Sequence, residues 1–190
     1  KVLAFPVIDE VKMPQFSVFL FNENGEDYLS YQNLPKNEIL IYSIDSQCLI
    51  KRLCINTEGD NSVVGGFGGY YIADMQHIFI PSMYVNTIFV VDTVGKVRRK
   101  ITYEKTRDNQ ELKPFMLSDR SQMVFIGNNL YIPQTINLRL GDKAIAESPI
   151  KVVIDTAENI IKALPMRFPP LISCKDFGTV GAFGAEYSCC

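Results

Sequence analysis

The chain has a single histidine, His77, and only five cysteines among its 190 residues. It has no C-x-x-C motif, so neither a zinc site nor a redox site is expected from the usual ligand spacings. Cys48 and Cys54 lie on one predicted strand and are roughly 20 Å apart, since an extended chain advances ~3.3 Å per residue, and this is far beyond disulfide reach. Pairing stays open among the three C-terminal cysteines, Cys174, Cys189 and Cys190.

The sequence also lacks a basic run, and no apolar run approaches the ~18 residues that a transmembrane helix needs. Its formal net charge of −2 provides no electrostatic footprint for nucleic acid or an anionic membrane. No initiator methionine or signal peptide is visible at Lys1, so we expect a processed chain or a piece of a longer one. Hydrophobic residues at 47% and charged residues at 21% indicate a folded globular chain rather than a disordered one.

What the chain does contain is a succession of short strand patterns, clearest over residues 63–103. Strands are predicted at residues 64–72, 78–80, 87–91 and 97–103. Turn residues such as Asp74 and Asn86 separate them, because their side chains hydrogen-bond the local backbone or tolerate positive φ. Four antiparallel strands joined in this way make one β-meander.

The pattern repeats along the chain. The third strand of each unit ends in an aspartate followed by serine or threonine, at Asp45, Asp92 and Asp155, and these aspartates are 47 and 63 residues apart. This spacing is within reach of a four-stranded propeller blade with variable loops. The side-chain oxygens are expected to accept backbone N–H groups in the turn that follows, so a structural role is predicted for them.

Two local patterns have competing interpretations. The glycine-rich segment at 65–69 returns at 181–185, but Gly68-Gly69 runs into Tyr70-Tyr71-Ile72. A dinucleotide-binding loop must instead open a helix, so an innermost propeller strand is predicted. Residues 155–164 resemble a capping box followed by a short helix, whereas the repeat predicts a turn and an outer strand. We therefore predict the turn and the outer strand.

These observations predict an all-β propeller of about three blades, at residues 16–55, 64–103 and 115–166. The first strand of a fourth blade is expected near residue 178. Propellers typically need four to eight blades to close a ring. The chain is therefore interpreted as a single partial propeller domain, the N-terminal part of a ring of six blades.

The order of elements resembles a domain-of-unknown-function family of six-bladed propeller lipoproteins from the envelope of gut bacteria. The matching segments are residues 3–6, 26–29, 37–40, 65–71 and 86–97. The resemblance implies a location outside the cytoplasm, as a periplasmic or surface lipoprotein. It implies no catalytic residue.

Candidate binding residues are sought in the loops that join the second and third strands and those that lead to the next blade. These loops open on one face, and loops on a rigid scaffold are where binding residues tend to lie. The third-blade loop is long. The candidate ligand-binding residues are Tyr84, as an aromatic wall, and Asn86, Arg139, Asp142, Lys143 and Arg167.

We expect a non-catalytic binding or scaffolding propeller that takes a protein or glycan partner and needs no cofactor. The alternative is a propeller hydrolase or lactonase with calcium in the axial channel. Calcium takes six to eight oxygen ligands, and the predicted inner strands offer mainly glycine, phenylalanine and tyrosine. The isolated chain is expected to self-associate through its open blade faces, unless residues 1–8 fold back across blade one.

Overall fold

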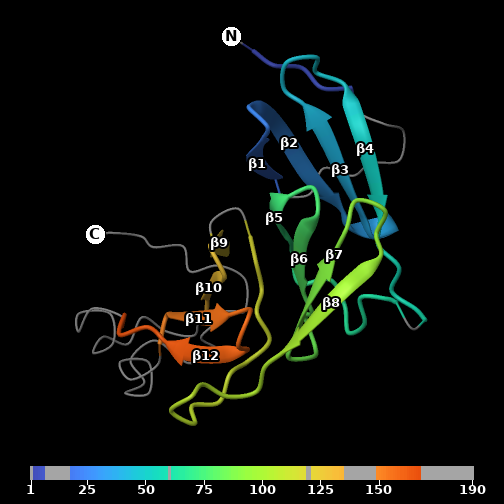
Figure 1. Cartoon of the computed structure of the whole chain (residues 1–190). Coiled ribbons are helices and arrows are strands. Elements are labelled where there is room, and N and C mark those ends of the chain that lie inside the picture. The colour runs from blue at the N-terminus through green and yellow to red at the C-terminus, as the bar shows by residue number, and fades with distance from the viewer. Residues whose placement is uncertain (1, 7–17, 60, 119–120, 135–148, 168–190) are drawn as a thin grey trace, which may run out of the picture.

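The computed structural model describes residues 2–6, 18–59, 61–118, 121–134 and 149–167. They form an all-β fold of three four-stranded antiparallel sheets (Figure 1), which confirms the predicted fold class. In each sheet, strands that follow one another in sequence are neighbours. Each sheet is therefore a meander, arranged like a propeller blade.

The three sheets are named blades 1 to 3 in chain order. Blade 1 comprises β1 (Val18–Glu23), β2 (Glu26–Asn33), β3 (Glu38–Ser43) and β4 (Leu49–Cys54), with a short 3-10 helix at Leu34–Lys36. Blade 2 comprises β5 (Tyr71–Asp74), β6 (His77–Pro81), β7 (Thr87–Val91) and β8 (Val97–Thr102). Blade 3 comprises β9 (Val124–Ile126), β10 (Asn129–Pro133), β11 (Lys151–Asp155) and β12 (Ile160–Ala163).

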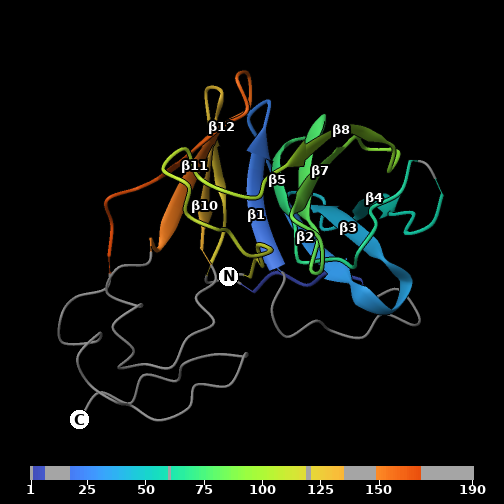
Figure 2. The same ribbon diagram turned by 90° about the horizontal axis from the view of Figure 1, so that it is seen from below.

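The first strands of the blades lie next to one another, β1 against β5 and β5 against β9. In the view of Figure 2, the three sheets fan out from the side where these first strands meet. Among the described residues, no helix is long and apolar enough to cross a membrane.

Blade 2 is buried on both faces, which explains its nearly continuous apolar strands. Successive side chains on a strand point to opposite faces of the sheet. Ile78 and Phe89 accordingly belong to the core shared with blade 1, whereas Phe79 and Ile88 belong to the core shared with blade 3. The described residues thus form two hydrophobic clusters, one in each gap between neighbouring blades.

The predicted turn chemistry is confirmed in blades 2 and 3. Asp92 Oδ1 accepts the backbone N–H groups of Val94 and Lys96, both at 3.0 Å. Asp155 Oδ1 accepts those of Ala157 and Glu158. Burial acts to raise the pKa of Asp92, but its two backbone hydrogen bonds and the Arg98 guanidinium outweigh that effect and hold the pKa below its usual value.

The glycine-rich segment is not the strand that its sequence predicts. Gly65, Gly66 and Gly69 have φ values of +77°, +79° and +88°, which an extended strand does not permit. The first strand of blade 2 therefore begins only at Tyr71. Before it, a single bridge joins Phe67 to Ser82.

The glycines instead allow close approach between backbones of neighbouring blades. A Cβ at Gly69 would lie 2.6 Å from the carbonyl oxygen of Leu117, in the segment leading to blade 3. Leu117 N–H in turn donates to Gly68 O at 2.8 Å. The segment is a junction between blades, and the lack of a side chain is what permits it.

Residues 155–164 form a turn and then β12, as the repeat predicts, rather than a short helix. The expected first strand of a fourth blade, near residue 178, lies outside the described residues. So do Cys174, Cys189 and Cys190. Cys48 and Cys54 are both free, so they do not pair with each other, as their predicted separation requires.

The N-terminal segment lies across the outer face of blade 1. The Phe5 ring meets the Tyr42 ring edge-on at 5.6 Å, and the Tyr42 hydroxyl donates to Pro6 O. Ala4 N–H also donates to Gln47 Oε1 at 3.0 Å. For residues 2–6 the structure therefore shows the fold-back across blade 1 that was named above as the exception to an open blade face.

Candidate functional site

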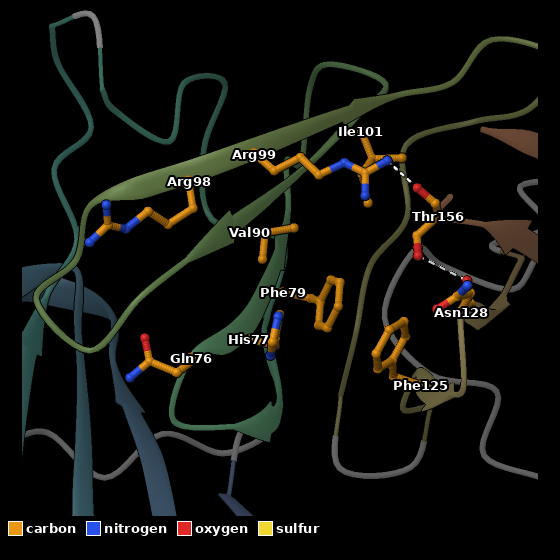
Figure 3. Close-up of a pocket in the computed structure, with 10 residues that line it drawn as sticks. All are labelled: Gln76, His77, Phe79, Val90, Arg98, Arg99, Ile101, Phe125, Asn128 and Thr156. Atoms are coloured by element: carbon orange, nitrogen blue, oxygen red, sulfur yellow. Dashed lines mark hydrogen bonds between the residues drawn. The ribbon is translucent and has the colours of Figure 1, made fainter. Parts of the chain in front are cut away.

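A pocket of about 500 Å³ opens between blades 2 and 3 (Figure 3). It lies near the β5–β6, β9–β10 and β11–β12 turns, and side chains of the outer strand β8 reach into it. Its apolar lining consists of Phe79, Val90, Ile101 and Phe125. Its polar lining consists of Gln76, His77, Arg98, Arg99, Asn128 and Thr156.

Aromatic rings form one wall of the pocket. The rings of Phe79 and Phe125 lie 5.2 Å apart between centroids, and His77 stacks on Phe125 at 6.4 Å. Phe79 is buried in the core between the blades, whereas Phe125 is only partly buried. Phe125 therefore presents the apolar surface that a bound group would contact.

Arg99 reaches across the pocket from blade 2 to blade 3. Its guanidinium donates to the backbone oxygen of Thr156 (Figure 3). Thr156 is itself fixed, because its hydroxyl and its N–H both donate to Asn128 O, at 2.9 and 2.8 Å. The β9–β10 and β11–β12 turns and Arg99 thus form one hydrogen-bonded rim.

Arg98 has a different partner from its neighbour. Its Nε lies 2.6 Å from Asp92 Oδ2, and its guanidinium points away from Thr156 in Figure 3. None of the ion pairs among the described residues involves Arg99. Arg99 therefore brings to the pocket a positive charge that the described carboxylates do not pair.

His77 is held in place by Asp74. Its Nδ1 lies 2.9 Å from both carboxylate oxygens of Asp74. Asp74 Oδ1 also accepts the backbone N–H groups of Gln76 and His77. Burial acts to raise the Asp74 pKa, but these hydrogen bonds outweigh it and lower the pKa. The pair therefore orients the imidazole at the mouth of the pocket.

Two of the predicted binding residues lie at the opposite end of blade 2, in the loop between β6 and β7. Tyr84 is 76% exposed, and its backbone N–H donates to Gly65 O. Asn86 has a structural contact, since its side-chain amide donates to Leu112 O at 3.3 Å. The structure brings these two together on one loop and does not bring them to the pocket.

The other predicted residues follow β10 in the sequence. Arg167 donates from Nη1 to the backbone oxygens of Leu164 and Met166, at 2.7 and 3.0 Å. Its side chain is therefore bound to the backbone of the segment that follows β12. Arg139, Asp142 and Lys143 lie outside the described residues. Within the described part of the chain, no group of three or more His, Cys, Asp or Glu side chains could hold a metal ion.

The family model described as "Domain of unknown function (DUF4221)" matches residues 3–188. The chain belongs to this family. A domain-of-unknown-function family was expected from the sequence, and at that level the resemblance is confirmed. No curated protein matches the chain.

A crystal structure of a DUF4221 family member from Bacteroides vulgatus is similar, with a TM-score of 0.75 and 22% sequence identity. The match covers 88% of this chain and 47% of the other. This chain therefore spans about half the length of that family member, and the likeness establishes a shared fold.

Two further structures are much less similar to this chain. A protein of unknown function from Bacteroides caccae has a TM-score of 0.37 and 11% identity, covering 80% of this chain and 68% of that one. The dihydro-heme d1 dehydrogenase NirN has a TM-score of 0.36 and 14% identity, covering 80% and 28%.

A second polar cluster of this DUF4221 chain lies in blade 1, where β2 meets β3. The buried Asn33 amide donates to Glu38 Oε2 at 3.0 Å, and Arg52 lies 3.6 Å from Glu38 Oε1. Asn33 Oδ1 and Gln32 Nε2 are buried without a hydrogen-bond partner. This end of blade 1 corresponds to the Tyr84 loop of blade 2.

The pocket was not predicted from the sequence, although one signal for it was available. Ile101 is an apolar residue on a strand otherwise rich in cations. Because side chains two residues apart share a face, Arg99 must lie on the same face as Ile101. The periodicity of the sequence shows that the two side chains share a face. It does not show which blade packs against that face, because this depends on tertiary packing.

Proposed function

We propose that this DUF4221 chain is a non-catalytic binding module, and that the pocket between blades 2 and 3 receives its ligand. The observation that carries the proposal is that one pocket is lined both by the guanidinium of Arg99, free of any described ion pair, and by the partly buried ring of Phe125. Small-molecule sites are typically clefts of roughly 300–1,000 Å³ with apolar walls and a few placed polar groups. The pocket, at about 500 Å³, fits that description.

The polar groups of the pocket support binding over catalysis. A catalytic hydroxyl needs a base within hydrogen-bond reach, whereas the Thr156 hydroxyl donates to the carbonyl oxygen of Asn128. His77 is tied to Asp74 in an exposed turn. The described hydrogen bonds thus do not join the Thr156 hydroxyl to the imidazole of His77.

The binding proposal is tested through His77, the single histidine of the chain. Its ring gives one imidazole signal in a proton NMR spectrum, and it lies at the mouth of the pocket. Mixtures of organic acids, sugars and short peptides are added in turn. We expect at least one class to shift the His77 signal in a saturable manner.

Tyr84→Ala serves as the matched control, because it removes an exposed ring from the loop at the far end of blade 2. It should leave the response unchanged. If no class shifts the His77 signal, the proposed pocket is wrong. If Tyr84→Ala abolishes a response, the ligand occupies the loop face that the sequence predicts, with Tyr84, Asn86 and Arg167.

We also propose that the full protein is a six-bladed propeller of the bacterial cell envelope, anchored as a lipoprotein. Three blades in a chain that spans about half of a family member support the blade number. The location rests on the family resemblance of the sequence. Fractionation of the host's cells, with detection of the protein in the membrane fraction, tests it.

The outer face of blade 3 supports the proposal that the isolated chain self-associates. Val124 and Ile126 are 45% and 62% exposed on β9, and both point away from blade 2. Burying such side chains contributes roughly 1.5–3 kcal/mol each. Size-exclusion chromatography with light scattering should give a mass above 21.5 kDa, and a monomer at all concentrations would contradict the proposal.

A further inference from the structure

We infer that the pocket between blades 2 and 3 selects a ligand with one carboxylate attached to an aromatic or similarly flat apolar body. The inference rests on the proposed binding function and specifies the chemistry of its ligand. Two features carry it: the charge of Arg99 and the ring of Phe125, which line the same pocket.

The charge requirement follows from the partners of Arg99. A guanidinium has five N–H donors in a planar fork, and the structure gives that of Arg99 one acceptor, the carbonyl oxygen of Thr156. The remaining donors face a pocket whose nearby carboxylates are engaged elsewhere, Asp92 with Arg98 and Asp74 with His77. An anion entering the pocket therefore meets an available guanidinium without competition from these two groups.

A single carboxylate matches this site better than a phosphate. A carboxylate carries one charge and two oxygens in the geometry of the guanidinium fork. A phosphate monoester carries about −1.5 to −2 charges near neutral pH and three acceptor oxygens. Arg98 is already held by Asp92 at 2.6 Å, so the second charge of a phosphate would stay without a cationic partner there.

The apolar requirement follows from the aromatic wall. Aromatic rings favour offset or edge-to-face arrangements with centroids about 4.5–7 Å apart. Phe79, Phe125 and His77 already form such a cluster, with separations of 5.2 and 6.4 Å. A further ring placed on the exposed side of Phe125 extends this cluster, and Asn128 and Gln76 provide amide groups at its edge.

The experiment uses 3-phenylpropionate as the probe, with calorimetry and the His77 NMR signal as readouts. Its neutral amide has the same shape without the charge, and propionate has the charge without the ring. We expect both controls to bind at least about tenfold more weakly, because hydrogen bonds to a charged group and burial of a ring each contribute more than 1.4 kcal/mol. Phenyl phosphate tests the competing anion class.

Arg99→Gln should make the acid and the amide bind equally, since the glutamine keeps a hydrogen-bond donor and loses the charge. Lys100→Gln is the matched control. Lys100 is the next cation on β8 but lies on the opposite face, over the Phe89 ring at 5.7 Å, so its removal should preserve the preference. Thermal melting of both variants verifies that they are folded.

The free acid and the C-terminus of a peptide share this chemistry. Gly-Gly-Phe with a free carboxyl group, compared with its C-terminal amide, distinguishes the two sources. Binding of the tripeptide acid more tightly than phenylpropionate assigns the site to peptide ends, and the reverse assigns it to small acids.

Three results overturn the inference while leaving a binding function in place. They are equal affinity for acid and amide, tighter binding of phenyl phosphate, and an acid preference that survives Arg99→Gln. If neither these probes nor the wider mixtures shift the His77 signal, the binding function itself fails. The two levels of the proposal are thus separable.

Discussion

Gly69→Ala is expected to lower the free energy of unfolding by about 3 kcal/mol or more. Gly69 has a φ of +88°, and a Cβ there would lie 2.6 Å from Leu117 O and 2.9 Å from Leu117 Cβ. The left-handed backbone alone costs an L-residue about 1–2 kcal/mol, and overpacking adds typically 1–3 kcal/mol. Neither contacting atom is at the end of a flexible side chain, so the clash is relieved only by moving backbone.

The matched control is Gly25→Ala in the β1–β2 turn. Gly25 has nearly the same φ, +83°, but no atom lies within 4 Å of the added Cβ. Gly25→Ala should lower the free energy of unfolding only by the cost of the left-handed backbone, about 1 kcal/mol. Urea denaturation of both variants measures the difference, which reports the close approach between blades. Equal losses for the two variants would show that Leu117 does not constrain Gly69.

Phe115→Ala should lower the free energy of unfolding by about 3–5 kcal/mol, as much as Gly69→Ala or more. Large-to-small changes of buried aromatic residues typically have effects of this size. Phe115 is fully buried in the core between blades 2 and 3. Its ring stacks on Tyr103 at 4.3 Å, and its backbone N–H donates to the Tyr103 hydroxyl. The substitution removes the ring but retains that hydrogen bond, so the loss measures packing.

Tyr84→Ala provides the surface comparison, because it removes a larger aromatic side chain that is mostly exposed. Its effect on the free energy of unfolding should stay within about 0.5 kcal/mol. Denaturation monitored by circular dichroism gives both values. A loss of less than about 1 kcal/mol for Phe115→Ala would mean that the segment between blades 2 and 3 is not part of the cooperative core.

The strands and turns were predictable because their causes are local. Asp92 and Asp155 hydrogen-bond N–H groups two to four residues away, so their roles follow from short sequence patterns. The pairing of β6 with β7 follows from two apolar runs and the turn between them. These features need no knowledge of the rest of the chain.

The glycine segment and the pocket were not predictable in the same way. A glycine is compatible with both an extended strand and a left-handed turn, and what decides between them at Gly69 is Leu117, nearly fifty residues later. The pocket likewise joins Arg99 of blade 2 to Thr156 of blade 3. Contacts between residues so distant in sequence depend on how the blades pack.

The burial of blade 2 on both faces also has an evolutionary consequence. A substitution at Ile78 changes the packing against blade 1, whereas one at Phe79 changes the packing against blade 3. Neighbouring residues of one strand are thus under different selective constraints. Each can co-vary with residues of a different blade. A duplicated copy of blade 2 could replace another blade only after both sets of positions had diverged to suit two new neighbours.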